Sequence, residues 1–160
     1  MLTITKRAAV NAVPQLHIVL PFESRTKSRL RTHATSGEDV GIFLERGSIL
    51  RDGDLLETDD GRVVQVLAAD EDVSTVHSPD PRQLARVSYH LGNRHVALQI
   101  GPTWVRYLHD HVLDDMVRGL GLEVVVERAP FEPEAGAYGA RSHSHAHAHS
   151  LSPLLPHRHD

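Results

Sequence analysis

The feature that most constrains the fold is a change in the spacing of apolar residues near residue 70. Before this point apolar residues alternate with polar ones or form short runs, at 16–22, 40–44 and 63–67, a pattern typical of β-strands. Asp-Gly pairs at 52–53 and 60–61 separate apolar segments and predict hairpins, because glycine adopts positive φ at little cost. We therefore predict an all-β domain over residues 1–70.

Beyond residue 70 the pattern alternates between strand and helix. Asp80 is a good N-cap with Pro81 in the first helical position, and Gly92 is expected to end that helix. Asp110 is expected to cap a second helix that ends at Gly121. The predicted strands cover residues 73–77, 95–100, 104–108 and 122–127. The order βαββαβ is that of a ferredoxin-like domain, which we predict over residues 71–138 of an α+β chain.

Histidine is unusually frequent, with thirteen residues in 160, and six of them lie in the last eighteen. From residue 139 no periodic apolar pattern offsets the entropy of ordering, so we predict a flexible His-rich tail over 139–160. Imidazoles at every second position of 143–149 can converge on one ion, whereas the alternative is a low-complexity end without a role. The candidate tail ligands are His143, His145, His147, His149, His157 and His159.

Composition narrows the chemistry and the partners. The chain has no cysteine, which excludes thiolate ligands and leaves nitrogen and oxygen donors for a metal. Its formal charge of -4 argues against nucleic acid as a partner. Neither a signal-peptide pattern nor an apolar run of membrane-spanning length is present, so we expect a cytoplasmic protein without membrane contact.

Four other histidines are candidates for metal binding. His109 and His111 lie where a strand is expected to meet a helix, a junction that can turn both rings outward, although each could equally be a plain surface residue. The residue between them, Asp110, is expected to be the helix cap. His90 and His95 flank the turn after the first helix, where position alone favours backbone or solvent contacts.

Basic residues alternate along a predicted strand of the first domain, at Arg25, Lys27, Arg29 and Arg31. The default interpretation is a solvated strand face. The alternative is a docking stripe for an acidic protein surface, because like charges on one face raise the local potential and steer association.

Enzyme signatures such as G-x-S-x-G, the P-loop and H-E-x-x-H are absent from the sequence. A metal-dependent hydrolase using His109 and His111 with Asp114 or Asp115 is one rival hypothesis. We do not expect an enzyme, because histidines on a tail and at a surface junction do not make a preorganised, water-excluding site.

Several segments resemble the UreE family of urease accessory proteins, which are nickel metallochaperones. In the second half they are residues 89–95 (YHLGNRH), 106–116 (RYLHDHVLDDM) and 131–139 (FEPEAGAYG). In the first half, residues 22–31 (FESRTKSRLR) and 46–54 (RGSILRDGD) resemble the family's N-terminal peptide-binding β domain. The sequence departs from the usual motif at Ala97, where related proteins often carry proline.

The resemblance implies roles for individual residues. His95 matches the histidine that binds nickel across a homodimer interface, and His109 and His111 match an accessory pair. His90 matches a histidine near that interface, and the tail histidines are implied to feed ions toward it. The implied partners are the urease apoprotein and its accessory proteins, including a nickel-binding GTPase.

The resulting hypothesis is a homodimer that binds Ni²⁺ through histidines and delivers it for urease maturation. Cu²⁺ and Zn²⁺ also suit imidazole ligands, so they are expected to bind as well. The rival from another class is a passive store, in which the tail buffers divalent metal and the folded domains matter little.

Overall fold

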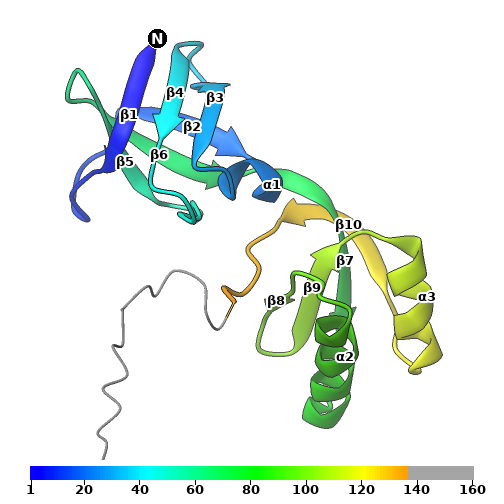
Figure 1. Cartoon of the computed structure of the whole chain (residues 1–160). Helices are drawn as coiled ribbons and strands as arrows, with labels where there is room; N and C mark the ends of the chain where they lie inside the picture. The colour runs from blue at the N-terminus through cyan, green and yellow to red at the C-terminus, as the bar shows by residue number, and fades with distance from the viewer. Residues whose placement is uncertain (137–160) are drawn as a thin grey trace, which may run out of the picture.

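The structure, a computed structural model, describes residues 1–136. In this part the chain forms two β-sheets, each with its own hydrophobic core. They are joined where β7 (Asp70–His77) leaves the first half and β10 (Val125–Pro130) returns toward it (Figure 1). None of the helices within residues 1–136 has both the length and the apolar character needed to cross a lipid bilayer.

The first sheet has six strands in the order β2-β6-β5-β1-β4-β3. Its strands are β1 (Leu2–Arg7), β2 (Leu16–Leu20), β3 (Arg29–His33), β4 (Asp39–Phe43), β5 (Leu55–Thr58) and β6 (Val63–Ala68). The pairs β1–β4 and β2–β6 are parallel, and the others are antiparallel. The expectation of a purely β half was wrong in one place, because the short helix α1 (Phe22–Arg25) follows β2.

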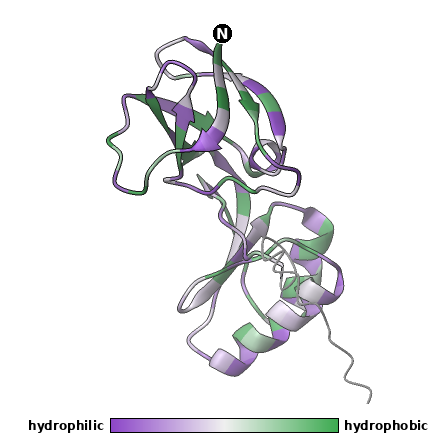
Figure 2. Cartoon of the chain, turned by 60° about the vertical axis from the view of Figure 1, so that its left-hand side comes forward, coloured by the Kyte–Doolittle hydropathy of each residue, from purple (hydrophilic) through white to green (hydrophobic). Residues whose placement is uncertain are grey.

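Alternation along the strands places the core of the first half. Leu16, Ile18 and Leu20 are buried in β2 while Val19 between them is exposed, because successive side chains of a strand point to opposite faces. Ile18 lies opposite Val66 of β6, which is also buried. Bands of hydrophobic and hydrophilic residues therefore alternate along these strands (Figure 2).

Only one of the two Asp-Gly pairs lies in a hairpin between neighbouring strands. Gly61 has φ 84° and lies between β5 and β6, which pair antiparallel as the predicted hairpin. Gly53 also has positive φ, at 86°, but it belongs to the loop between β4 and β5, which are not neighbours in the sheet. The hairpin predicted at 52–53 was therefore wrong, since both arms of that turn pair with other strands.

The second half follows the predicted order of strands and helices. Its elements are β7 (Asp70–His77), α2 (Pro81–Asn93), β8 (Gln99–Ile100), β9 (Trp104–Leu108), α3 (His111–Gly119) and β10 (Val125–Pro130). The sheet is antiparallel in the order β10-β7-β9-β8. Val87 and Leu91 of α2 share one core with Val117 of α3 and Tyr107 of β9, so both helices cover the same sheet face.

Two strand boundaries differ from the prediction. The strand expected at 95–100 is reduced to β8, because residues 94–96 are used in ending α2. The last strand begins at Val125, opposite Thr75, and not at residue 122, because Leu122 and Val124 pack into the helix-covered core.

The two halves meet at a buried arginine. The side chain of Arg25 is fully buried and donates to the carbonyl oxygens of Leu20 and Leu50 of the first half. It also donates to the carbonyl of Phe131 and forms an ion pair with Glu132, both beyond β10. Since α1 and the segment after β10 are more than a hundred residues apart, this contact fixes one half against the other.

Candidate metal centre

His95 lies immediately after α2 in an unusual backbone conformation. Its φ is 57°, and it is the only residue other than glycine within 1–136 with positive φ. Its N–H donates to the carbonyl of Gly92 at 3.0 Å, and the N–H of Val96 donates to that of Leu91 at 3.3 Å. These two bonds form a Schellman motif, in which glycine is the usual left-handed residue. Histidine therefore occupies a position where glycine would cost less.

The consequence of this cap is an exposed ring at a defined point. His95 is exposed, and its backbone is fixed by the motif while its side chain leaves the helix end. Left-handed residues that carry side chains are concentrated at functional sites, where the surrounding structure holds them in place. The sequence prediction that Gly92 closes the helix was wrong, since Gly92 is helical and α2 continues to Asn93.

His90 lies in the last turn of α2 and is partly buried. Its ring meets the ring of Tyr89 edge to face, with centroids 5.3 Å apart. Tyr89 itself is 69% exposed, which leaves an uncovered aromatic surface beside His90, in the last part of the helix that His95 follows.

The junction between β9 and α3 holds His109 and His111 on either side of the helix cap. Asp110 accepts hydrogen bonds from the backbone N–H groups of Val112 at 2.8 Å and Leu113 at 3.2 Å, which confirms its predicted role as N-cap. The same bonds lower the pKa of Asp110, because they favour its ionised form. His111 is the first residue of α3 and is exposed.

His109 differs from His111 because one of its nitrogens is held by buried groups. The Nδ1 atom lies 3.0 Å from Oδ2 of Asp114 and 3.1 Å from Oγ of Ser74. The hydroxyl of Tyr107 donates to Oδ1 of the same carboxylate at 2.6 Å. Burial, and then the Asp114 carboxylate, raise the pKa of Tyr107, so its hydroxyl keeps its proton.

Sequence reasoning missed this buried cluster. Asp114 was considered only as a hydrolase carboxylate, and Tyr107 and Ser74 were not singled out. The available signal was the spacing between Tyr107, His109 and Asp114, because alternate strand residues followed by one helical turn can converge. For the hydrolase hypothesis the geometry is unfavourable, since both Asp114 oxygens already have partners and Asp115 is an exposed partner of Arg118.

The described chain does not by itself assemble a complete metal site. Within residues 1–136 no group of three or more histidine or acidic side chains is placed to hold an ion. The tail candidates, His143, His145, His147, His149, His157 and His159, lie outside the described residues.

The predicted basic stripe is only partly a surface. Arg25 is in α1, buried at the joint between the halves, so its assignment to an exposed strand and a docking role was wrong. Arg29 and Arg31 are exposed on β3, where Arg31 pairs with Asp39 at 2.8 Å. Lys27, Arg29 and Arg46 line an open groove of about 690 Å³. Within residues 1–136 none of the three forms an ion pair.

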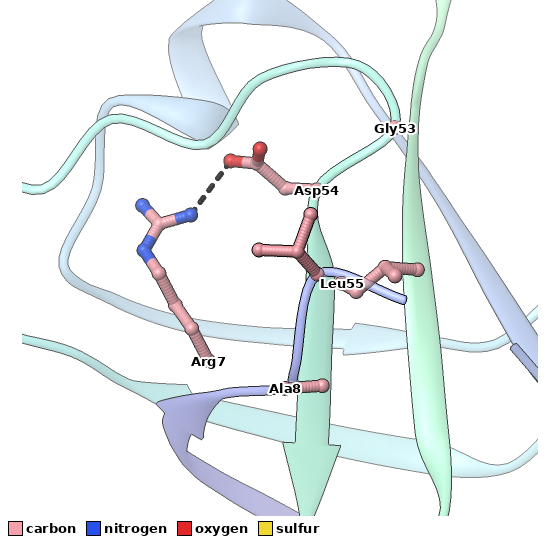
Figure 3. Close-up of a pocket in the computed structure, with 6 residues that line it drawn as sticks. Arg7, Ala8, Gly53, Asp54 and Leu55 are labelled. Atoms are coloured by element: carbon pink, nitrogen blue, oxygen red, sulfur yellow. Dashed lines mark hydrogen bonds and ion pairs between the residues drawn. The ribbon is translucent and has the colours of Figure 1, made fainter. Parts of the chain in front are cut away.

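A second pocket lies near the end of β1 and the start of β5, shown in Figure 3. Arg7 and Asp54 face each other across it in an ion pair of 2.8 Å, and Leu55 contributes apolar surface. The pocket has about 210 Å³ and no histidine in its lining. It therefore has no evident connection with the candidate metal ligands.

The two sheets and their separate cores define a two-domain α+β protein with histidines at the ends of its second-half helices. The model of the UreE urease accessory protein N-terminal domain matches residues 3–69, and that of the C-terminal domain matches residues 71–160. The chain belongs to the UreE family of urease accessory proteins.

Individual relatives agree with this assignment. The urease accessory protein UreE of Alkalilimnicola ehrlichii is 61% identical over 139 residues, which cover 87% of this chain and 85% of the relative. The UreE of Pseudomonas putida strain W619 is 56% identical, covering 89% of each chain. The UreE of Proteus mirabilis is 56% identical, covering 79% of this chain and 78% of its own.

Proposed function

We propose that this protein is a nickel metallochaperone that binds Ni²⁺ through histidines as a homodimer and delivers it to the urease apoprotein. Delivery would involve the urease accessory proteins, including a nickel-binding GTPase, in the cytoplasm, and the protein itself would not be an enzyme. The observation that carries the proposal is His95, an exposed imidazole held in a left-handed helix cap. Membership of the urease accessory family supports it.

His95 is the proposed central ligand, contributed once by each copy of the chain. A single imidazole binds a divalent ion weakly, so two symmetry-related rings give a site that one copy lacks. This is consistent with the lack of a three-ligand group within the described part of one chain. We propose His109 and His111 as an accessory pair, and His90 as a neighbour of the dimer interface.

The tail histidines are proposed to collect ions and pass them to His95. The chain leading to the tail is anchored beside the loop that follows His95, because Glu134 N–H donates to the Leu98 carbonyl at 2.8 Å (Figure 1). His95 precedes Leu98 by three residues, which span at most about 10 Å, while the nine residues from Glu134 to His143 can span about 30 Å. The tail is therefore long enough to reach His95 without domain movement.

Transfer is proposed to proceed by ligand exchange. Imidazole ligands favour Ni²⁺, Cu²⁺ and Zn²⁺, and Cu²⁺ binds such ligands at least as strongly as Ni²⁺. Selectivity for nickel would then come from the supply of metal and from the receiving partner.

We further propose the domain division 1–70, 71–138 and 139–160, with a ferredoxin-like second domain. The βαββαβ order and the strand order β10-β7-β9-β8 support that class. We also propose that Lys27, Arg29 and Arg31 belong to a docking surface for an acidic partner. Arg25 is not part of this surface, because its side chain is buried. Support comes from the groove that Lys27 and Arg29 share with Arg46.

Truncation tests delivery against passive storage. A chain ending at residue 139 is titrated with Ni²⁺ by calorimetry beside the full chain, and each is compared with its His95→Ala variant. We expect the truncated chain to keep one ion per dimer and to lose it when His95 is replaced. Complete loss of nickel binding on truncation would instead favour the passive store.

A further inference from the structure

The carboxylate of Asp114 is buried against the sheet and uses both oxygens within the protein. Its side chain is 2% exposed. Oδ1 accepts the Tyr107 hydroxyl at 2.6 Å, and Oδ2 lies 3.0 Å from Nδ1 of His109. Burying a carboxylate carries a large desolvation penalty unless its oxygens are hydrogen-bonded. An apolar residue on this helix face would avoid that penalty.

These contacts determine which nitrogen of neutral His109 carries the hydrogen. A carboxylate only accepts hydrogen bonds, so the Nδ1 atom facing it must donate. Ser74 Oγ, at 3.1 Å from Nδ1, can share that hydrogen as a second acceptor. Neutral imidazole has one N–H, and Nε2 is therefore left with a free lone pair.

The free nitrogen is on the side of the ring that faces away from the buried carboxylate. The His109 side chain is 38% exposed although its Nδ1 edge meets a carboxylate that is 2% exposed. Because the Nδ1 edge faces this buried carboxylate, we infer that the exposed part of the ring is the opposite edge, formed by Nε2 and Cδ2. A hydrogen bond from the backbone N–H of His109 to the Asp72 carbonyl, at 3.0 Å, fixes the backbone of this residue against β7, while the ring is held by its Nδ1 contacts with Asp114 and Ser74.

We propose that Asp114 is a positioning residue that keeps His109 in the Nδ1–H tautomer and presents Nε2 to a divalent metal ion, with Tyr107 holding the second oxygen of the carboxylate. This inference rests on the proposed function, because it assigns the geometry of the accessory pair. Carboxylates that hold the second nitrogen of a metal-binding histidine raise its basicity and fix its orientation.

The test uses the full chain and reads His95 and His109 separately. Ring nitrogen chemical shifts of His109 are measured by NMR without metal over a series of pH values, and the tautomer is read where the shifts themselves show a neutral ring. Ni²⁺ is then added, and its paramagnetic broadening of each ring is followed. We expect the Nδ1–H tautomer in the unmodified protein, a result that needs no variant and is independent of folding effects.

Asp114→Asn is the informative substitution, because an amide can donate as well as accept and no longer forces the hydrogen onto Nδ1. We expect the Nε2–H form to increase, and the Ni²⁺ concentration that broadens His109 to rise by about 10- to 100-fold. Asp115→Asn is the matched control, since Asp115 is 75% exposed and pairs with Arg118 on the surface of the same helix. Asp115→Asn should change neither the tautomer of His109 nor the midpoint, which is the Ni²⁺ concentration that half-broadens the His109 signals.

The outcomes separate this inference from the proposed function. An Nε2–H tautomer in the unmodified protein would overturn the positioning role, as would an unchanged His109 midpoint in Asp114→Asn. Failure of Ni²⁺ to broaden His109 at all would remove the accessory site and this inference with it. Failure at the His95 ring, read in the same spectra, would count against the chaperone proposal and leave the assignment of Asp114 standing.

Discussion

At the scale of single residues, His95 combines a proposed metal ligand with an unfavourable backbone position. Its φ of 57° places it in the left-handed region, where a residue with a Cβ atom costs roughly 1–2 kcal/mol relative to its relaxed conformation. The Schellman hydrogen bonds of residues 95 and 96 compensate for that cost. Glycine would have a lower conformational free energy at this position. A histidine here is therefore explained if its imidazole has a function.

Replacing His95 with glycine should therefore separate stability from metal binding. We expect His95→Gly to raise the free energy of unfolding of the metal-free protein by about 1 kcal/mol, because glycine adopts this φ without strain. Nickel binding at the dimer should be lost. Urea denaturation measures the stability and a nickel titration measures the binding. His95→Ala is the control, because it should lose nickel binding without the increase in the free energy of unfolding. Equal stability of the Gly and Ala variants would contradict the strain argument.

At the scale of elements, the N-cap of α3 makes a pH-dependent contribution to stability. Backbone hydrogen bonds lower the pKa of Asp110 in the folded state. The unfolded chain then binds the proton first as the pH falls, so the stabilisation is complete above an ordinary carboxyl pKa of about 4. This stabilisation is lost as the pH falls further, through the lowered pKa that Asp110 has in the folded protein.

Asp110→Asn tests this sign, because asparagine keeps the cap but does not titrate. We expect the difference in unfolding free energy between the two proteins to be constant near neutral pH and to move steadily against the unmodified protein below pH about 4. Denaturant unfolding at a series of pH values measures it. A difference that stays constant over the whole acid range would show that the cap is not linked to protonation.

The elements that could be predicted from the sequence are those determined by local signals. Asp80 and Pro81 begin α2 and Asp110 begins α3 as expected, since capping involves residues only two or three apart. The end of α2 could not be predicted, because the left-handed position went to His95 although Gly92 stood nearby. The shortness of β8 follows from the same cap.

The parts of the candidate site that escaped prediction depend on contacts between distant segments. Ser74 meets His109 across a separation of 35 residues. The buried state of Arg25 depends on Phe131, which is 106 residues further along the chain. Alternating charges in the sequence could not reveal that the first of the four basic residues is covered by the second domain.

At the scale of the whole molecule, Arg25 connects the two halves and anchors the approach to the tail. We expect Arg25→Met to lower the free energy of unfolding by about 3 kcal/mol, which is at the lower end of the range for breaking a buried ion pair. The loss is at that end because Glu132 is partly exposed and also lies near Arg51. Denaturant unfolding measures the change. Hydrogen exchange at the backbone N–H groups of Glu132 and Glu134 should accelerate, because Arg25 no longer holds this segment.

The matched control for this joint is Arg29→Met, which removes an exposed arginine of β3. Surface substitutions of this kind change stability by no more than about 0.5 kcal/mol. If the Arg25 and Arg29 variants were equally stable, the buried ion pair would not be what holds the two halves together.

The proposal that two His95 side chains share one nickel ion is tested most directly by nickel titration of the full chain with mass measurement under native conditions. This measurement reports the number of chain copies and the number of bound ions in the same spectrum. We expect a dimer that takes up nickel at neutral pH, with one ion per dimer lost when His95 is replaced by alanine. A single copy at every concentration, or a chain that stays metal-free in excess nickel, would contradict the proposal.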